Sequence, residues 1–334
     1  MEFGAVPTAR ASGALLAHSV ALPDGRLRKG LVLQAPDIAR LLAAGVAEVT
    51  VARPGPLDLA EDAAADRLAA ALVPDPAAAG LTLSPASTGR VNLKAAGIGI
   101  VQIDTAAIHA LNRLDPAITL ATLPPFARVA PGQMVGTVKI IAYAVPGAAL
   151  SQAEALAHAA LRILPVTLGS AGLLLTEVPG QDDKLTRKGR RAVEGRLRAL
   201  GMELAGVEVT AHDTQAMAAA LTRLPGAMLL ILTGSATSDL HDTGPQALRA
   251  AGGSVARFGM PVDPGNLLFH GRLGQRPVIG LPGCARSPAL NGADWVLDRL
   301  ACGLTVNDDD IAEMGVGGLL KETPVRGRPR DHAE

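Results

Sequence analysis

The sequence predicts an α/β fold for the C-terminal half of the chain, with a mostly parallel sheet and helices on both faces, preceded by a β-rich, mixed α+β N-terminal region. Residues 227–232 form a short, continuous apolar run bounded by small residues, as in a strand buried on both faces. A helical pattern over 243–251 follows this run, and a strand-like run at 207–211 is likewise followed by a helical pattern over 214–224. Strands that alternate with helices in this way are typical of a parallel sheet.

The N-terminal half predicts a strand–helix–strand unit followed by a series of short strands. A helix begins near Ala35-Pro36-Asp37 and stops at Gly45, before a strand at 48–51. An alanine-rich helix follows over 59–72. Alternating apolar residues then predict strands at 89–93, 98–103, 118–123 and 136–145. The turn at 129–136 between two of these strands favours a small β-barrel.

The length of the chain predicts more than one domain. A single hydrophobic core rarely serves 334 residues. We expect a mixed α+β, barrel-like region over 1–165, an α/β ligand-binding domain over 166–304, and a polar tail over 305–334. The tail carries the acidic run Asp308–Asp310 and then a Pro-, Arg- and Gly-rich end, which is typical of solvated, partly disordered chain.

The composition excludes several classes of partner. Lys and Arg together number 31, as do Asp and Glu, so the chain lacks the excess of positive charge that nucleic acids and anionic membranes attract. Aromatic residues make up only 2%, which leaves almost no platform for stacked bases. We therefore expect neither nucleic acid nor a membrane as a partner.

The N-terminus and the cysteines favour a cytoplasmic protein. Residues 1–19 lack the basic start and apolar run of a secretory signal. The longest apolar region, 155–175, is interrupted by His158, Arg162 and Pro165 and predicts a helix and then a strand. The two cysteines, Cys284 and Cys302, form neither a metal-ligand spacing nor a disulfide framework, as expected in a reducing compartment.

A turn of small residues follows the apolar run at 227–232. Such a turn, between the end of a strand and the start of a helix, lets backbone N–H groups approach an anion, and the helix dipole adds partial positive charge. Thr233-Gly234-Ser235 alone is a weak signal, because glycine and serine are common in ordinary turns. Asp239 and Asp242 make it more specific, since carboxylates beside a phosphate site imply a bridging cation such as Mg²⁺.

Three segments, in the right order, resemble the molybdopterin-binding domain of the MoaB/Mog type, which also forms the core of molybdopterin molybdotransferases. The first is Thr233-Gly234 with Asp242 and Pro245. The second is Asp213, where the family has an acidic residue that faces the ligand. The third is the segment 280–287, Gly-Leu-Pro-Gly-Cys-Ala-Arg-Ser, which is similar to the family's Leu-Pro-Gly-Asn-Pro-Val-Ser loop. The resemblance covers residues 166–304.

The chain departs from the family in two places. Cys284-Ala285-Arg286 replaces the Asn-Pro-Val centre of the loop, and Asn266 stands where molybdotransferases have the lysine of a Met-x-Pro-Gly-Lys segment. Arg286 could clamp a phosphate with two donors, or it could pair with Asp263 or Asp294 and brace the loop. Cys284 is expected to fill space, because nothing beyond Arg286 marks a lowered thiol pKa.

The resemblance implies a molybdopterin-binding protein of molybdenum cofactor biosynthesis. It would insert molybdate into molybdopterin, adenylylated or not, with Mg²⁺ present. Asp213 and Asp242 would be the catalytic residues and Asp242 the metal ligand, although each precedes a helix and could be only its cap. The residues that would hold the cofactor are Thr233, Gly234, Ser235, Asp239, Pro282, Gly283, Arg286 and Ser287.

The departures favour an alternative function. A non-catalytic chaperone or sensor would bind molybdopterin and pass it to a molybdoenzyme or a cofactor-maturation protein. In either case we expect a homo-oligomer.

Residues 184–198 form a strongly basic helix. They contain Lys184, Arg187, Lys188, Arg190, Arg191, Arg196 and Arg198, with Glu194 as the single acid. The pattern indicates a solvated helix face with Val193, Leu197 and Leu200 buried. The alternative places Lys184 and Arg187 beside an anionic ligand.

Overall fold

The computed structural model describes residues 1–180 and 182–321. The chain divides into two compact units, one of residues 1–97 and 101–164 and one of residues 98–100 and 165 onward. Both units contain helices and strands, so the mixed α/β composition predicted from the sequence is confirmed. Within the described residues, no helix is both long and apolar enough to span a membrane.

The first 53 residues form a small sheet with one helix. β5 (Glu48–Arg53) lies between β1 (Glu2–Pro7) and β2 (Leu15–Leu16) and pairs antiparallel with both. α1 (Ala35–Ala43) starts where predicted, because Gln34 and Asp37 cap its first turn reciprocally. The remaining elements are a turn of 3-10 helix, η1 (Thr8–Arg10), and a hairpin of β3 (Val20–Leu22) and β4 (Gly25–Leu27).

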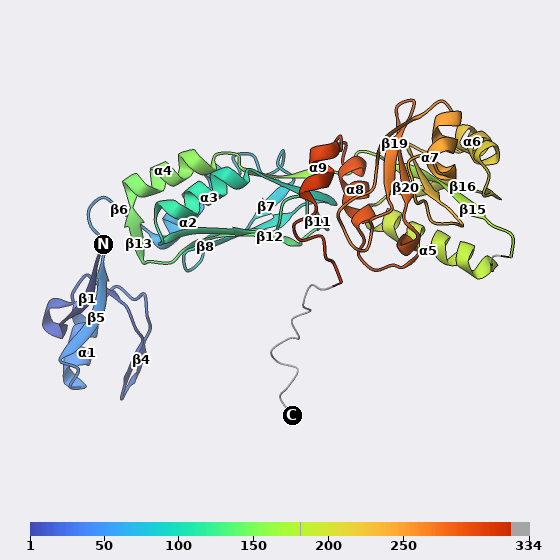
Figure 1. The fold of residues 1–334 in the computed structure, drawn as a ribbon. Coiled ribbons are helices and arrows are strands. Elements are labelled where there is room, and N and C mark those ends of the chain that lie inside the picture. The colour runs from blue at the N-terminus through green and yellow to red at the C-terminus, as the bar shows by residue number, and fades with distance from the viewer. Residues whose placement is uncertain (181, 322–334) are drawn as a thin grey trace. The chain divides into compact units, whose positions relative to one another are not determined.

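The rest of the first unit is built on a four-stranded antiparallel sheet. Its strands are β7 (Leu81–Leu83), β8 (Arg90–Ala95), β10 (Ile118–Thr122) and β12 (Met134–Ile140), and its helices are α2 (Glu61–Leu72), α3 (Thr105–Leu114) and α4 (Gly147–Ala157). Val91, Leu93 and Ala95 alternate toward one face and share a core with the three helices, which lie together on that side in Figure 1. The strand order β10-β12-β8-β7 leaves two edges, so this sheet is open and the barrel favoured by the turn pattern is not formed.

One predicted strand is divided in the structure. The chain leaves the sheet after Ile140, and β13 (Ala144–Pro146) pairs with β6 (Asp58–Ala60) instead. The single strand predicted at 136–145 was wrong because Ile140, Ala144 and Val145 are all buried, so the apolar run hides the break. The remaining strands form a sheet in the order β11-β9-β14, made of β11 (Arg128–Val129), β9 (Gly99–Ile103) and β14 (Leu161–Pro165).

The second unit contains a six-stranded sheet in the order β16-β15-β17-β20-β19-β18. Its strands are β15 (Ser170–Glu177), β16 (Glu203–Ala211), β17 (Met228–Leu232), β18 (Ser254–Phe258), β19 (Phe269–Leu273) and β20 (Arg276–Leu281). The first four in this order are parallel to their neighbours, and β19 and β18 complete the sheet antiparallel. The strand predicted at 207–211 lies within β16, and the strand predicted at 227–232 begins one residue before β17.

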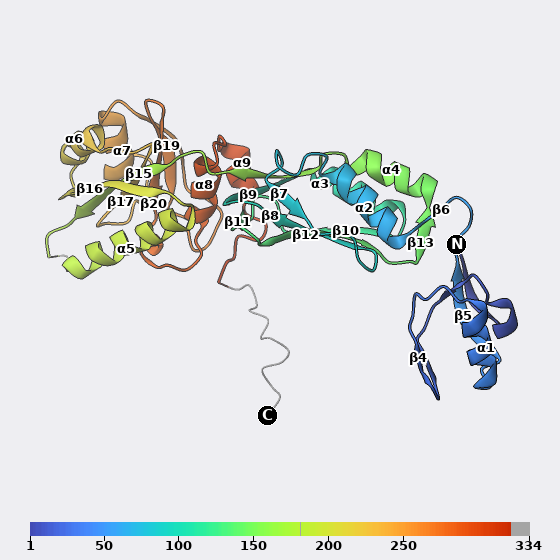
Figure 2. The same cartoon turned by 180° about the vertical axis from the view of Figure 1, so that it is seen from behind.

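Side chains of the central strands alternate between two hydrophobic cores, one on each face of the sheet. On β17, Leu230 and Leu232 face α5 (Asp183–Ala199) and α8 (Gly292–Ala301). Leu229 and Ile231 face α6 (Thr214–Arg223) and α7 (Thr243–Ala250). Figures 1 and 2 show α6 and α7 on one side of the sheet and α5 on the other. Burial on both faces explains why β17 is apolar at every position.

The segment after Leu304 begins as part of the core, although the sequence analysis assigned it to a polar tail. α9 (Asp308–Glu313) has Asn307 as its N-cap and three aspartates in its first turn, where negative charge stabilises a helix. Val306, Ile311 and Met314 are buried in the same core as α8. The Pro-, Arg- and Gly-rich end predicted to be disordered lies mostly outside the described residues.

His270, on β19, makes the stability of the second unit sensitive to acid. The residue is 4% exposed, and Nε2 has no hydrogen-bond partner among the described residues. Burial lowers the pKa of His270, a shift that Asp308 on α9 opposes and Arg257 on β18 reinforces. The folded state therefore holds the ring neutral, while the unfolded chain takes up a proton near the ordinary pKa of about 6.5.

We expect the free energy of unfolding to fall as the pH drops below about 6.5, because protons then bind the unfolded state preferentially. Urea unfolding of the wild type and of His270→Leu, measured between about pH 5 and pH 8, checks this. The leucine variant should lose less stability at low pH. Equal losses in the two proteins would rule out His270 as the source.

Candidate functional site

The Thr233-Gly234 loop, directly after β17, is held by side chains from two neighbouring segments. The Gly234 N–H donates to Thr176 Oγ1 at 2.8 Å, and Arg286 Nη2 donates to the Thr233 carbonyl oxygen at 2.5 Å. Thr233 Oγ1 donates to the carbonyl oxygen of Ser235 at 2.6 Å. The structure thus brings together Thr233, Gly234, Ser235 and Arg286, four of the residues predicted to hold a cofactor.

The loop lies at the point where the order of the parallel strands reverses. β15 has β16 on one side and β17 on the other, and the two connecting helices, α5 and α6, cover opposite faces of the sheet. The connections diverge at this point, so the carboxyl ends of β15 and β17 border a natural position for a ligand.

Two residues that the sequence analysis did not select belong to the same cluster. His212 Nδ1 lies 3.0 Å from Thr176 Oγ1, which is 1% exposed. The two residues are 36 positions apart in the chain, but both stand at the ends of adjacent parallel strands. That shared position, a polar residue at the end of a strand, was the only signal in the sequence.

Asp213 and Asp242 both cap helices. Asp213 Oδ1 accepts from the N–H groups of Gln215 and Ala216 at the start of α6. Asp242 accepts from Thr243 N–H at 2.7 Å and from Ser238 N–H at 2.9 Å at the start of α7. Burial raises the pKa of Asp242, but the bonds from Ser238 and Thr243 and the nearby His212 outweigh this and hold that pKa below its usual value. The carboxylate is therefore charged at neutral pH.

Replacing Asp242 with alanine should lower the free energy of unfolding by about 1 kcal/mol, the usual cost of a lost N-cap. This is small against the roughly 5–15 kcal/mol of a typical domain, so the variant should fold. Thermal unfolding and ligand titration of the same sample separate the two roles. A variant that binds ligand like the wild type and is only less stable would make Asp242 a cap and nothing more.

The segment 280–287 that resembles the family loop contains a short 3-10 helix, η2 (Gly283–Arg286), and is anchored by Arg196 of α5. Arg196 Nε pairs with Asp294 Oδ1 at 2.8 Å, and both side chains are about 6% exposed. The guanidinium also donates to the carbonyl oxygens of Ala285, Ser287 and Ala289. The prediction that Arg196 lies on a solvated face was wrong, because Asp294 and the loop carbonyls compensate its burial.

Arg286 is half-buried, and among the described residues its one hydrogen-bond partner is the Thr233 carbonyl oxygen. Its Nε is buried without a partner among the described residues, and Arg286 forms no ion pair there. Burial lowers the pKa of the Arg286 guanidinium. α5 packs closely on this side chain at Gly189: a Cβ atom added to that glycine would lie 2.7 Å from Leu232 Cδ2 and 3.8 Å from Arg286 Nε. Of the two carboxylates considered as alternative partners of Arg286, Asp263 and Asp294, the second pairs with Arg196.

Cys284 is exposed, so the expectation that it fills space was wrong. Its Sγ accepts a hydrogen bond from Asn291 Nδ2 at 3.0 Å, while the neighbouring Ala285 is the buried residue of the loop. Asn266 lies in a separate turn. Its side-chain Nδ2 donates to the Met260 carbonyl oxygen at 3.4 Å and its backbone carbonyl oxygen accepts from Met260 N–H at 3.0 Å, so the Asn266 side chain bonds within its own turn.

The carboxylates do not form a metal cage by themselves. No group of three or more His, Cys, Asp or Glu side chains placed to hold a metal is found in the described part of the chain. Asp239 Oδ1 accepts from His241 N–H, and both oxygens of Asp242 already accept hydrogen bonds. These residues fit Mg²⁺ only in the mode in which one or two carboxylates share the ion with ligand phosphates.

The basic face of α5 points to solvent. Lys184, Arg187, Lys188, Arg190, Arg191 and Arg198 are exposed, and Arg187 and Arg190 form surface pairs with Asp183 and Glu194. Val193, Leu197 and Leu200 are buried, as predicted. Thr186, on the flank of α5, donates to Glu177 Oε1 at the end of β15, which brings the start of the helix near the candidate site.

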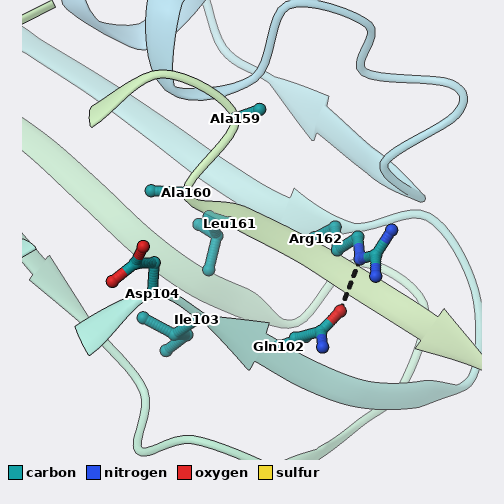
Figure 3. Close-up of a pocket in the computed structure, with 7 residues that line it drawn as sticks. All are labelled: Gln102, Ile103, Asp104, Ala159, Ala160, Leu161 and Arg162. Carbon is teal, nitrogen blue, oxygen red and sulfur yellow. Dashed lines mark hydrogen bonds between the residues drawn. The ribbon is translucent and has the colours of Figure 1, made fainter. Parts of the chain in front are cut away.

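A separate pocket of about 260 Å³ lies in the first unit (Figure 3). It is lined by Gln102, Ile103, Asp104, Ala159, Ala160, Leu161 and Arg162. Arg162 Nε donates to Gln102 Oε1, and Asp104 caps α3. None of these residues was predicted to be functional.

Comparisons with known proteins give few matches in sequence. A family model described as a domain of unknown function (DUF8806) matches residues 5–53. None of the curated proteins matches the chain.

Two solved structures similar to the chain are both described as proteins of cofactor biosynthesis. One is a molybdopterin biosynthesis MoeA protein from Pyrococcus horikosii, with 13% identity, 90% of this chain and 75% of that chain covered, and a TM-score of 0.30. The other is a molybdenum cofactor biosynthesis protein from Pyrococcus furiosus. It is 11% identical, the match covers 93% of this chain and 65% of that chain, and the TM-score is 0.24. TM-scores of this size carry no weight for the candidate site.

Proposed function

We propose that the second unit binds molybdopterin, adenylylated or not, at the carboxyl edge of its sheet, and that the protein acts in molybdenum cofactor biosynthesis in the cytoplasm. The resemblance of the loops at 233–245 and 280–287 to the MoaB/Mog family supports this. The observation that carries the proposal is the Nε–H of Arg286, which lies beside the Thr233-Gly234 loop and is buried without a partner among the described residues. A buried donor without an acceptor is costly, and an anionic group of the ligand would supply the missing acceptor.

The positions of the other groups define how such a ligand would be held. The Gly234 N–H is already bonded to Thr176, so the loop would contribute its shape and the exposed Ser235 rather than this N–H. Pro282 and Gly283 would wall the site, with Ser287 at the end of the same loop. Mg²⁺, where present, would lie between Asp242 or Asp239 and a phosphate of the ligand.

Molybdate insertion would require Asp213 or Asp242 to act on a ligand while capping a helix. Because both carboxylates have that structural role, and because the Asn266 side chain bonds within its own turn, we also propose a second candidate function. In it the protein is a carrier that delivers molybdopterin to a molybdoenzyme or a maturation protein.

The two functions differ in one measurable product. Molybdopterin is titrated into the purified protein to measure the affinity. In a second experiment, adenylylated molybdopterin is incubated with the protein, molybdate and Mg²⁺. Release of AMP identifies insertion, and retention of the ligand without AMP identifies a carrier. Absence of binding to both forms of molybdopterin would overturn the proposed function itself.

A further inference from the structure

We propose that His212 is a ligand-binding residue of this site, with Nδ1 held by Thr176 and Nε2 free to donate a hydrogen bond to an anionic oxygen of the ligand. The inference rests on the proposed function for the identity of the ligand, but not for the position of the imidazole. His212 is half-buried and joins the end of β16 to the start of α6.

The hydrogen bonds of Thr176 determine the tautomer of His212. Thr176 Oγ1 accepts from Gly234 N–H, so its own hydrogen remains to be donated. Thr176 is 1% exposed, and His212 Nδ1, at 3.0 Å, is the acceptor that the described residues offer this hydrogen. A neutral ring that accepts at Nδ1 carries its hydrogen on Nε2. The cluster therefore orients a donor on the outer side of the ring.

The surroundings of His212 favour an anion at that donor. Within the described residues, Nε2 of His212 has no hydrogen-bond partner. The ring directly precedes α6 and lies close enough to Asp242, at the start of α7, to act on its charge. The two helix N-termini attract negative charge, but each is already occupied by a capping carboxylate. A hydrogen-bond donor this close to Asp242 supplies a favourable contact for a phosphate or another oxyanion.

Two substitutions separate the two nitrogens of the ring. In His212→Asn, the amide can still accept from Thr176, but no atom reaches the position of Nε2. In His212→Gln, the longer side chain places an amide nitrogen near that position. We expect His212→Asn to bind molybdopterin about ten- to hundredfold more weakly than the wild type, the effect of losing one hydrogen bond to a charged group, and His212→Gln to bind more tightly than His212→Asn.

The same substitution at the exposed His18 of the first unit, His18→Asn, is the matched control, and thermal unfolding shows that each variant folds. Equal affinities of His212→Asn and the wild type would overturn the inference.

A second measurement uses the wild type and inorganic phosphate, and does not depend on molybdopterin. In protein labelled with ¹⁵N-histidine, phosphate should shift the Nε2 resonance of His212 and leave that of His18, in the first unit, in place. An unchanged Nε2 resonance would also overturn the inference. If the wild type fails to bind molybdopterin but the phosphate shift occurs, the proposed function fails while the anion-binding role of His212 stands.

Discussion

Arg196→Ala is expected to lower the free energy of unfolding of the second unit by about 3–5 kcal/mol, the cost of removing one partner of a buried ion pair. The substitution leaves Asp294 as a buried carboxylate without its partner Arg196. It also removes the donors to the carbonyl oxygens of Ala285, Ser287 and Ala289, so the loop that carries Arg286 loses its anchor. We therefore expect weaker binding of molybdopterin together with the loss of stability.

Arg190→Ala is the matched control for this experiment. Arg190 lies on the same helix and pairs with Glu194 at 2.7 Å, but its side chain is 54% exposed. Exposed pairs contribute about 0–1 kcal/mol. Urea unfolding of the two variants compares a buried and an exposed arginine of one helix. Similar losses in both would mean that burial of the Arg196–Asp294 pair adds nothing to stability.

Arg286→Lys is expected to weaken binding of molybdopterin about tenfold to hundredfold, which corresponds to the roughly 1.5–3 kcal/mol of one hydrogen bond to a charged group. A lysine can keep the contact with the Thr233 carbonyl oxygen, but an ammonium group cannot present a second donor in the plane of the guanidinium. The unpartnered Nε–H is the donor that would be lost.

The control for Arg286 is Arg198→Lys, the same chemical change at an exposed position. Titration of molybdopterin at two salt concentrations measures both effects. A direct contact predicts that the difference between Arg286→Lys and the wild type persists at high salt, because buried interactions are screened little. If the lysine variant binds as tightly as the wild type, Arg286 only braces the loop at Thr233.

The elements of the second unit could be predicted because their signals are local. β17 is a short apolar run, and α6 and α7 each begin after an aspartate whose carboxylate caps the first turn. The division of the strand predicted at 136–145 could not be seen in the same way, because apolar residues continue through the break although Ile141 is exposed there. The sequence also carries a local signal for the start of α9, because Asn307 and Asp310 are spaced to cap its first turn reciprocally.

The candidate site could be predicted only where one segment carries it. The loop at 233–235 and Arg286 were proposed from their own sequence, and Arg286 contacts that loop in the structure. The contact between Thr176 and His212 joins two strand ends, and the partner of Arg196 lies 98 residues away. A regular spacing of charges predicts which face of a helix is polar, but it cannot show that a distant carboxylate allows one of those charges to be buried.

The core of the second unit also bears on the order in which it can fold during synthesis. Val306, Ile311 and Met314 pack in the same core as residues of β15. While the ribosome still holds the segment after Leu304, the sheet could form, but the core that includes α5 and α8 would lack these three side chains. Final consolidation of the unit is therefore expected only after translation has passed Met314, and the growing chain exposes apolar surface until then.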